Sequence, residues 1–81
     1  MFETTIMLKN FEAVKEFVDI ANSKDYDIEL MSGKYIVNAK SIMGIFSLDL
    51  TQPLNIIAYS DGSDGFLDEI AEYIYKPEEN K

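Results

Sequence analysis

Two hydrophobic periodicities alternate along these 81 residues, and their order restricts the fold more than any other feature. Stretches in which every second residue is apolar indicate strands, whereas apolar residues three or four positions apart indicate helices. From the N-terminus the stretches run strand, helix, strand, strand, helix, strand, helix. A chain of this length makes one small domain. We therefore predict an α+β fold, βαββαβα, with three helices on one face of a four-stranded, largely antiparallel sheet.

The first half of the chain predicts three strands and one helix. Residues 2–8 alternate as a half-buried strand does, and Asn10 stands where a helix N-cap belongs. Residues 26–31 and 35–39 are strand-like and meet through Ser32 and Gly33, where glycine supplies the positive φ that a tight hairpin needs. The predicted helix presents one apolar face, made of Phe11, Val14, Phe17, Val18 and Ala21.

The second half predicts two further helices around a last strand. Ser41 caps a short helix that runs to about Leu48, and residues 54–59 alternate again. Residues 60–64 carry turn and cap chemistry, and Pro77 ends the last helix. Residues 1–76 are thus expected to form a single domain and residues 77–81 a flexible tail. The apolar face of the last helix consists of Phe66, Leu67, Ile70, Ala71 and Ile74.

The charge and the missing residue types exclude several functions. Fifteen acidic residues against seven lysines give a net charge of -8, which repels nucleic-acid phosphates and anionic lipid heads. The chain has no cysteine, which is compatible with the cytoplasm, the location that we expect. No apolar run approaches the roughly 18 residues of a membrane helix. The N-terminus also lacks the basic start and apolar core of a signal peptide.

A cluster of acidic residues near the C-terminus offers no metal site. An EF-hand loop starting at Asp61 needs glycine at its sixth position, where Phe66 stands. We interpret Asp61, Asp64, Asp68 and Glu69 as helix caps and a solvated face. A hydrolase with paired carboxylates is formally possible, but so short a chain offers no evident cleft. We therefore expect no metal, no cofactor, no catalytic residue and no enzymatic activity.

Residues 37–48 carry the most specific motif of the chain. They resemble the approach to the regulatory serine and the helix that follows it in the HPr family, the histidine-containing phosphocarriers of the bacterial sugar phosphotransferase system. Residues 59–64 are similar to the last strand and turn of that family, and the element order is the same. The resemblance runs from about residue 14 onward, and it implies the HPr open-faced sandwich. The central residues are Lys40, Ser41, Ile42, Met43, Gly44, Ile45, Phe46, Ser47 and Leu48.

The front of the chain departs from the family pattern, because it contains no histidine. An ungapped match puts Asn10 at the position of the lost phosphohistidine and Glu12 at that of the following arginine. The alternative is that several residues of the loop are missing. An asparagine amide is not a useful nucleophile, and Glu12 would repel the phosphate that an arginine clamps. Phosphotransfer from Enzyme I is therefore not expected, and the chain resembles the family's catabolite-repression variant, which lacks the histidine and keeps the serine.

The resemblance makes Ser41 the target of the ATP-dependent HPr kinase/phosphorylase. A phosphate there would meet the unpaired N–H groups and the positive dipole end of a helix, and Lys40 would add a nearby positive charge. The alternative is that Ser41 only caps the helix and that Lys40 is a solvated side chain.

The same helix is expected to bind protein partners, among them a transcriptional regulator. Ile42, Met43 and Phe46 would form an outward apolar patch, with Ile45 and Leu48 turned inward. Lys40 is expected to belong to the same partner-binding surface. The alternative is that all five are core residues. Acidic side chains on the first helix should disfavour the family's usual acidic partners, Enzyme I included. A second hypothesis is a protein-binding module on the HPr fold with no phosphorylation role.

Overall fold

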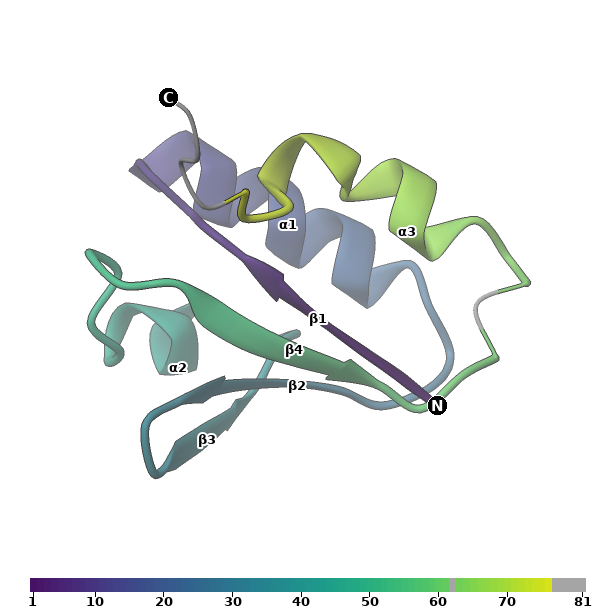
Figure 1. The fold of residues 1–81 in the computed structure, drawn as a ribbon, viewed down its shortest axis with the longest axis horizontal. Coiled ribbons are helices and arrows are strands. Elements are labelled where there is room, and N and C mark those ends of the chain that lie inside the picture. The colour runs from purple at the N-terminus through teal and green to yellow at the C-terminus, as the bar shows by residue number, and fades with distance from the viewer. Residues whose placement is uncertain (62, 77–81) are drawn as a thin grey trace.

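A four-stranded antiparallel sheet forms one layer of the molecule, and the helices form the other (Figure 1). The computed structural model describes residues 1–61 and 63–76. The strand order is β1-β4-β2-β3, so the last strand lies between the first two. The predicted α+β fold with its three helices is confirmed. The strands are β1 (Phe2–Ile6), β2 (Ile28–Ser32), β3 (Tyr35–Asn38) and β4 (Leu54–Ala58), and the helices are α1 (Phe11–Asn22), α2 (Ile42–Phe46) and α3 (Phe66–Glu69).

The hydrophobic core lies between the helices and one face of the sheet. The register aligns Leu30 with Ile56 and Ile56 with Thr4, so the alternating residues of three strands meet on that face. The opposite face carries polar and apolar residues in mixture, such as the row Glu3, Ile57 and Glu29. The helices contribute Val14, Phe17, Val18, Ala21, Ile45 and Phe66 to the core, and Ile70 joins them directly after α3. The strands contribute Ile6, Ile28, Leu30, Leu54, Ile56 and Ala58.

Two glycines are needed where they stand. Gly33 has a φ of +60° in the two-residue turn between β2 and β3, as the sequence predicts. Gly44 lies on α2, where a Cβ would come within 3.3 Å of Ser41 Oγ and 3.4 Å of Val37 Cβ. A side chain at this position would therefore first crowd the cap hydroxyl of Ser41.

Phe11 departs from the predicted apolar face of α1. Val14, Phe17, Val18 and Ala21 are buried as expected, but Phe11 is 57% exposed. It is the first residue of the helix, and its ring packs on α2 instead of the sheet. The periodicity was therefore right for the body of α1 and wrong for its first residue.

The strand boundaries also differ from the sequence prediction, by one residue in β3 and β4 and by two at the end of β1 and the start of β2. β1 ends at Ile6, although Leu8 is buried, and β2 begins at Ile28 instead of Tyr26. Tyr26 instead sets its ring edge-on to Phe66, with centroids 6.3 Å apart, and donates its O–H to Asp64. Leu8 and Tyr26 are therefore held by side-chain packing and not by pairing within the sheet.

The predicted single helix near the C-terminus is wrong. α3 ends at Glu69, Ile70 adopts φ -102° and ψ 12°, and a 3₁₀ turn follows at Ala71–Tyr73. Tyr73 in this turn is buried, whereas Leu67 and Ala71, both predicted for the apolar face, are exposed, Leu67 by 43%. The turn also lets Ile74 bridge to Ile6 on the free edge of β1, where Tyr75 N–H donates to Thr5 C=O at 2.8 Å.

The predicted tail at residues 77–81, with Pro77 as its first residue, lies outside the described residues. Over the part of the chain that the structure describes, no helix is long and apolar enough to cross a membrane.

Candidate docking and phosphorylation site

Asn10 caps α1, as the sequence predicts. Its backbone is extended, and its Oδ1 accepts a hydrogen bond from the Ala13 N–H at 2.8 Å. The connection from β1 comprises residues 7–10, and it is held at its start because the Met7 N–H donates to Tyr73 C=O. The Asn10 amide oxygen therefore stabilises the start of α1.

The exposed side of α1 beside this cap is acidic. Glu12, Glu16 and Asp19 are all exposed. Glu16 Oε1 accepts a hydrogen bond of 2.6 Å from the Tyr73 hydroxyl. Burial and, after it, the Glu16 carboxylate raise the pKa of Tyr73 far above the usual range of a tyrosine. This surface presents carboxylates to any protein that approaches Asn10.

Ser41 caps α2 and is exposed. Its backbone is extended, and its Oγ accepts a hydrogen bond from the Gly44 N–H at 3.1 Å. The Ser41 N–H donates to Asn38 C=O at 3.0 Å, which joins the cap to the end of β3. The hydroxyl is thus accessible from solvent while it stabilises the start of the helix.

Lys40 is directed to the end of α1. Its Nζ donates to Lys24 C=O at 2.8 Å, and its own carbonyl accepts from Asn22 Nδ2 at 3.1 Å. The side chain is half-buried. Lys40 therefore connects the residue before Ser41 to the C-terminal end of α1, a contact that the sequence pattern does not reveal.

The apolar residues of α2 divide into two sets. Ile45 is fully buried and Leu48 is half-buried against the core, so both turn inward as predicted. Ile42 was predicted to face outward with Met43 and Phe46, but it is half-buried, because its side chain packs against the core instead. Met43 is 79% exposed and Phe46 is 42% exposed. The alternative that all five are core residues is wrong, because a five-residue helix can turn only part of its surface toward the sheet.

Phe11 extends this exposed surface beyond α2. Its ring stacks on that of Phe46, with centroids 5.4 Å apart and planes 14° apart. The Lys15 ammonium lies 5.6 Å from the centroid of the Phe11 ring. We call Phe11, Met43 and Phe46 the docking patch. The sequence reasoning assigned Phe11 to the core, and only its place at the very start of α1 could have indicated otherwise.

The acidic residues near the C-terminus are engaged in structural contacts. Lys24 Nζ lies 2.8 Å from Glu69 Oε1 and 3.6 Å from Asp64 Oδ2. The Tyr26 hydroxyl, chiefly, lowers the pKa of Asp64, and Asp61 accepts the Ser63 N–H in the turn. No three acidic side chains within residues 1–61 and 63–76 are placed to share a metal ion.

Comparison with known proteins identifies the family. A family model described as "PTS HPr component phosphorylation site" matches residues 11–76. The structure of HPr-C-His from Thermoanaerobacter tengcongensis is 31% identical in sequence, with a TM-score of 0.74 and 91% of each chain covered.

Two further structures are similar. The phosphocarrier protein HPr from Bacillus anthracis is 30% identical, with a TM-score of 0.67, and the match covers 91% of this chain and 94% of that one. Crh, the catabolite repression containing protein of Bacillus subtilis, is 26% identical, with a TM-score of 0.61 and 88% of each chain covered. The chain therefore belongs to the HPr family of the phosphotransferase system, whose members are carrier proteins without enzymatic activity.

Proposed function

We propose that this chain is a regulatory member of the HPr family that carries no phosphate on histidine. In this proposal Ser41 is phosphorylated, and the docking patch binds a partner protein of the phosphotransferase network, such as a transcriptional regulator. The observation that carries the proposal is an exposed serine hydroxyl beside an exposed apolar patch, in a chain without histidine. The proposal includes a cytoplasmic location, which the lack of cysteine permits.

The residues around Asn10 argue against transfer from Enzyme I. The Asn10 side chain already accepts the Ala13 N–H, and an amide offers no nucleophile for a phosphoryl group. Glu12 is exposed two residues later, where it would repel a phosphoryl donor. The acidic side of α1 would also repel an acidic protein, so we expect Enzyme I not to be a partner.

Phosphorylation of Ser41 would change the docking patch from a neutral apolar surface to one with an anionic edge. A phosphoserine adds a charge of about -1.5 to -2 at neutral pH. Met43 lies two residues further on in the same helix, so this charge would favour a partner that carries basic groups beside its apolar contact.

The second candidate is a binding module on the same fold in which Ser41 serves only as a cap. Two contacts favour it: Ser41 Oγ accepts the Gly44 N–H, and the Lys40 ammonium donates to Lys24 C=O instead of standing free. On this reading the docking patch is the functional site by itself.

Incubation with HPr kinase/phosphorylase and ATP separates the two candidates. Intact mass followed by peptide mapping should find one phosphate, on Ser41. Ser41→Ala should remove it, whereas Ser47→Ala should not, although Ser47 is an equally exposed serine at the other end of α2. A protein that stays unmodified under conditions in which a true HPr is phosphorylated would favour the module without phosphorylation.

A parallel incubation with Enzyme I and phosphoenolpyruvate tests the other half of the proposal. The mass should stay unchanged, because the chain contains no histidine to accept the phosphoryl group. An added phosphate that is lost in acid would contradict this interpretation of the connection between β1 and α1.

A further inference from the structure

The charges of this chain are segregated along the sequence. Residues 33–48 contain two of the seven lysines and none of the 15 acidic residues, which gives this segment a net charge of +2. The rest of the chain therefore carries -10. The segment comprises β3, α2 and the turns on either side of β3. This segment itself repels a second acidic molecule less than the rest of the chain does, and its exposed positive charge is Lys34, since Lys40 donates to Lys24 C=O. Acidic residues of neighbouring segments stand beside it: Asp49 in the groove and Glu29 on β2.

Within this segment, β3 forms an open edge of the sheet. It pairs with β2 on one side, and in the described part of the chain no strand pairs with its other side. The opposite edge differs, because the Ile74 segment covers β1 through its bridge to Ile6. Alternate residues of β3 direct their N–H and C=O groups away from β2. An added strand can form hydrogen bonds with this whole row of backbone groups.

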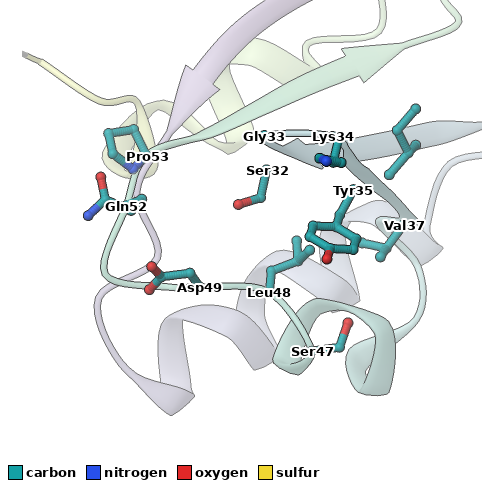
Figure 2. Close-up of a pocket in the computed structure, with 11 residues that line it drawn as sticks. Ser32, Gly33, Lys34, Tyr35, Val37, Ser47, Leu48, Asp49, Gln52 and Pro53 are labelled. Carbon is teal, nitrogen blue, oxygen red and sulfur yellow. The ribbon is translucent and has the colours of Figure 1, made fainter.

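A groove of about 940 Å³ lies beside this edge (Figure 2). One wall is the β2–β3 hairpin with Lys34, Tyr35 and Val37, and the other is the connection from α2 to β4 with Leu48, Asp49 and Pro53. Tyr35 and Leu48 are among the labelled side chains that line the groove in Figure 2.

The β3 edge exposes apolar side chains, and the groove beside it carries one positive and one negative residue. Tyr35 is 68% exposed and Ile36 is 57% exposed. Lys34 is exposed at the tip of the hairpin. Asp49 lines the far wall, and Thr51 holds its carboxylate by donating both its N–H and its hydroxyl. These hydrogen bonds lower the pKa of Asp49. Because the Asp49 carboxylate lines this wall, an acidic ligand is favoured only toward the Lys34 end.

We propose that the β3 edge and this groove bind an extended, acidic segment of a partner protein as a fifth strand of the sheet. The backbone of the segment pairs with β3. An apolar side chain enters the groove beside Tyr35 and Leu48, and an acidic side chain lies near Lys34. A second copy of this chain fits the edge less well, because each copy carries a net charge of -8. The site is separate from the docking patch and does not depend on Ser41.

Three synthetic octapeptides, which differ in charge or in one proline, test the proposal. The first probe alternates glutamate and valine, the second alternates lysine and valine, and the third replaces one central valine of the first by proline. Titration into ¹⁵N-labelled protein should shift the backbone amides of residues 34–38 with the first probe. The other two should bind about tenfold more weakly or worse, because one reverses the charge and the other removes an N–H from the added strand.

Matched variants locate the contact. Lys34→Glu should weaken the acidic peptide about tenfold and strengthen the basic one. Lys76→Glu changes the net charge equally and lies on an exposed segment after the strand-like pairing with β1, so it should leave both affinities unchanged. In a two-residue hairpin closed by Ser32 and Tyr35, Ile36 directs its N–H outward. Ile36→Pro should therefore abolish binding while the other amide signals keep their positions.

Three outcomes would overturn the proposal. The first is equal affinity for the acidic and basic peptides, and the second is an acidic peptide whose shifts are confined to α2 and Phe11, which would make the docking patch its site. The third is a dimer in sedimentation experiments that Ile36→Pro converts to monomer, which would assign the edge to a second copy of this chain. If Ile36→Pro fails to fold, the comparison of Lys34→Glu with Lys76→Glu still decides the question.

Discussion

The rings of Phe11 and Phe46 stack with their centroids 5.4 Å apart and their planes 14° apart. This contact joins the first residue of α1 to the last residue of α2. Phe11 follows the N-cap Asn10 directly, so the stack lies beside the start of α1.

The aromatic pair should contribute to stability as well as to docking. Phe11→Ala and Phe46→Ala, alone and combined, should give a coupling energy of about 0.5–1 kcal/mol in urea unfolding, because both rings are partly exposed. Phe46→Ala combined with Leu67→Ala is the matched control, since Leu67 has a similar exposure of 43% and lies on α3. That second pair should be additive; coupling of equal size in both cycles would argue against the stack.

The two helix caps should contribute similar amounts to the free energy of unfolding. Asn10→Ala and Ser41→Ala each remove a side-chain acceptor for a backbone N–H, so each should lower the free energy of unfolding by about 1 kcal/mol. Asn10→Asp and Ser41→Asp keep an acceptor at the cap and should recover most of the loss. Chemical unfolding at neutral pH measures all four variants. A Ser41→Ala protein as stable as the parent would contradict the capping role.

Tyr73 should make the protein sensitive to high pH. Burial and the Glu16 carboxylate raise its pKa in the folded state above the value of about 10 for an unfolded chain. The neutral phenol therefore contributes its full stability below about pH 10, and this contribution is lost as the pH rises further toward the folded pKa. Tyr73→Phe should flatten the decline in unfolding free energy above about pH 10. Tyr35→Phe, at a 68% exposed position, should leave it unchanged.

Lys24 should stabilise the end of α1 against α3. Its side chain is 10% exposed and pairs with Glu69 and Asp64, whose side chains are 46% and 36% exposed. Lys24→Met should cost no more than about 1 kcal/mol at neutral pH, because the carboxylates remain hydrated. The effect should be larger than that of Lys76→Met, which removes an exposed lysine.

The same pair predicts an acid dependence. Asp64 has a lowered pKa, first through the Tyr26 hydroxyl and also through Lys24, so its contribution is present above about pH 4 and is lost as the pH falls through the folded value. Lys24→Met should therefore lose less stability than the parent between about pH 5 and pH 2. If the unfolding free energies of the parent and Lys24→Met fall equally between about pH 5 and pH 2, the charge pairing is contradicted.

Local features were predictable from the chain because they depend on neighbouring residues. The caps at Asn10 and Ser41 need only an acceptor three residues before a free N–H, and the Gly33 turn needs only a positive φ. The burial of Ile45 followed from helical spacing. The exposure of Met43 was also expected, because a short helix cannot bury every side.

Contacts between distant segments were not predictable in this way. Whether Phe11 packs on the sheet or on Phe46 depends on where α2 lies, and Phe46 is 35 residues later in the chain. The direction of the Lys40 ammonium depends on the position of Lys24 C=O, 16 residues earlier. Neither of these two contacts can be predicted from the spacing of residues or from composition.

The sequence by itself determined the element order, the two helix caps, the absence of histidine and the charge contrast between residues 33–48 and the rest. Periodicity and residue chemistry act over a few neighbouring positions, so these features can be obtained from the chain alone. The tertiary structure decided which apolar residues stay exposed and which sheet edge is covered. The break at Ile70 shows why: a regular helix there would satisfy local propensity, but the 3₁₀ turn buries Tyr73 and pairs the chain with the edge of β1.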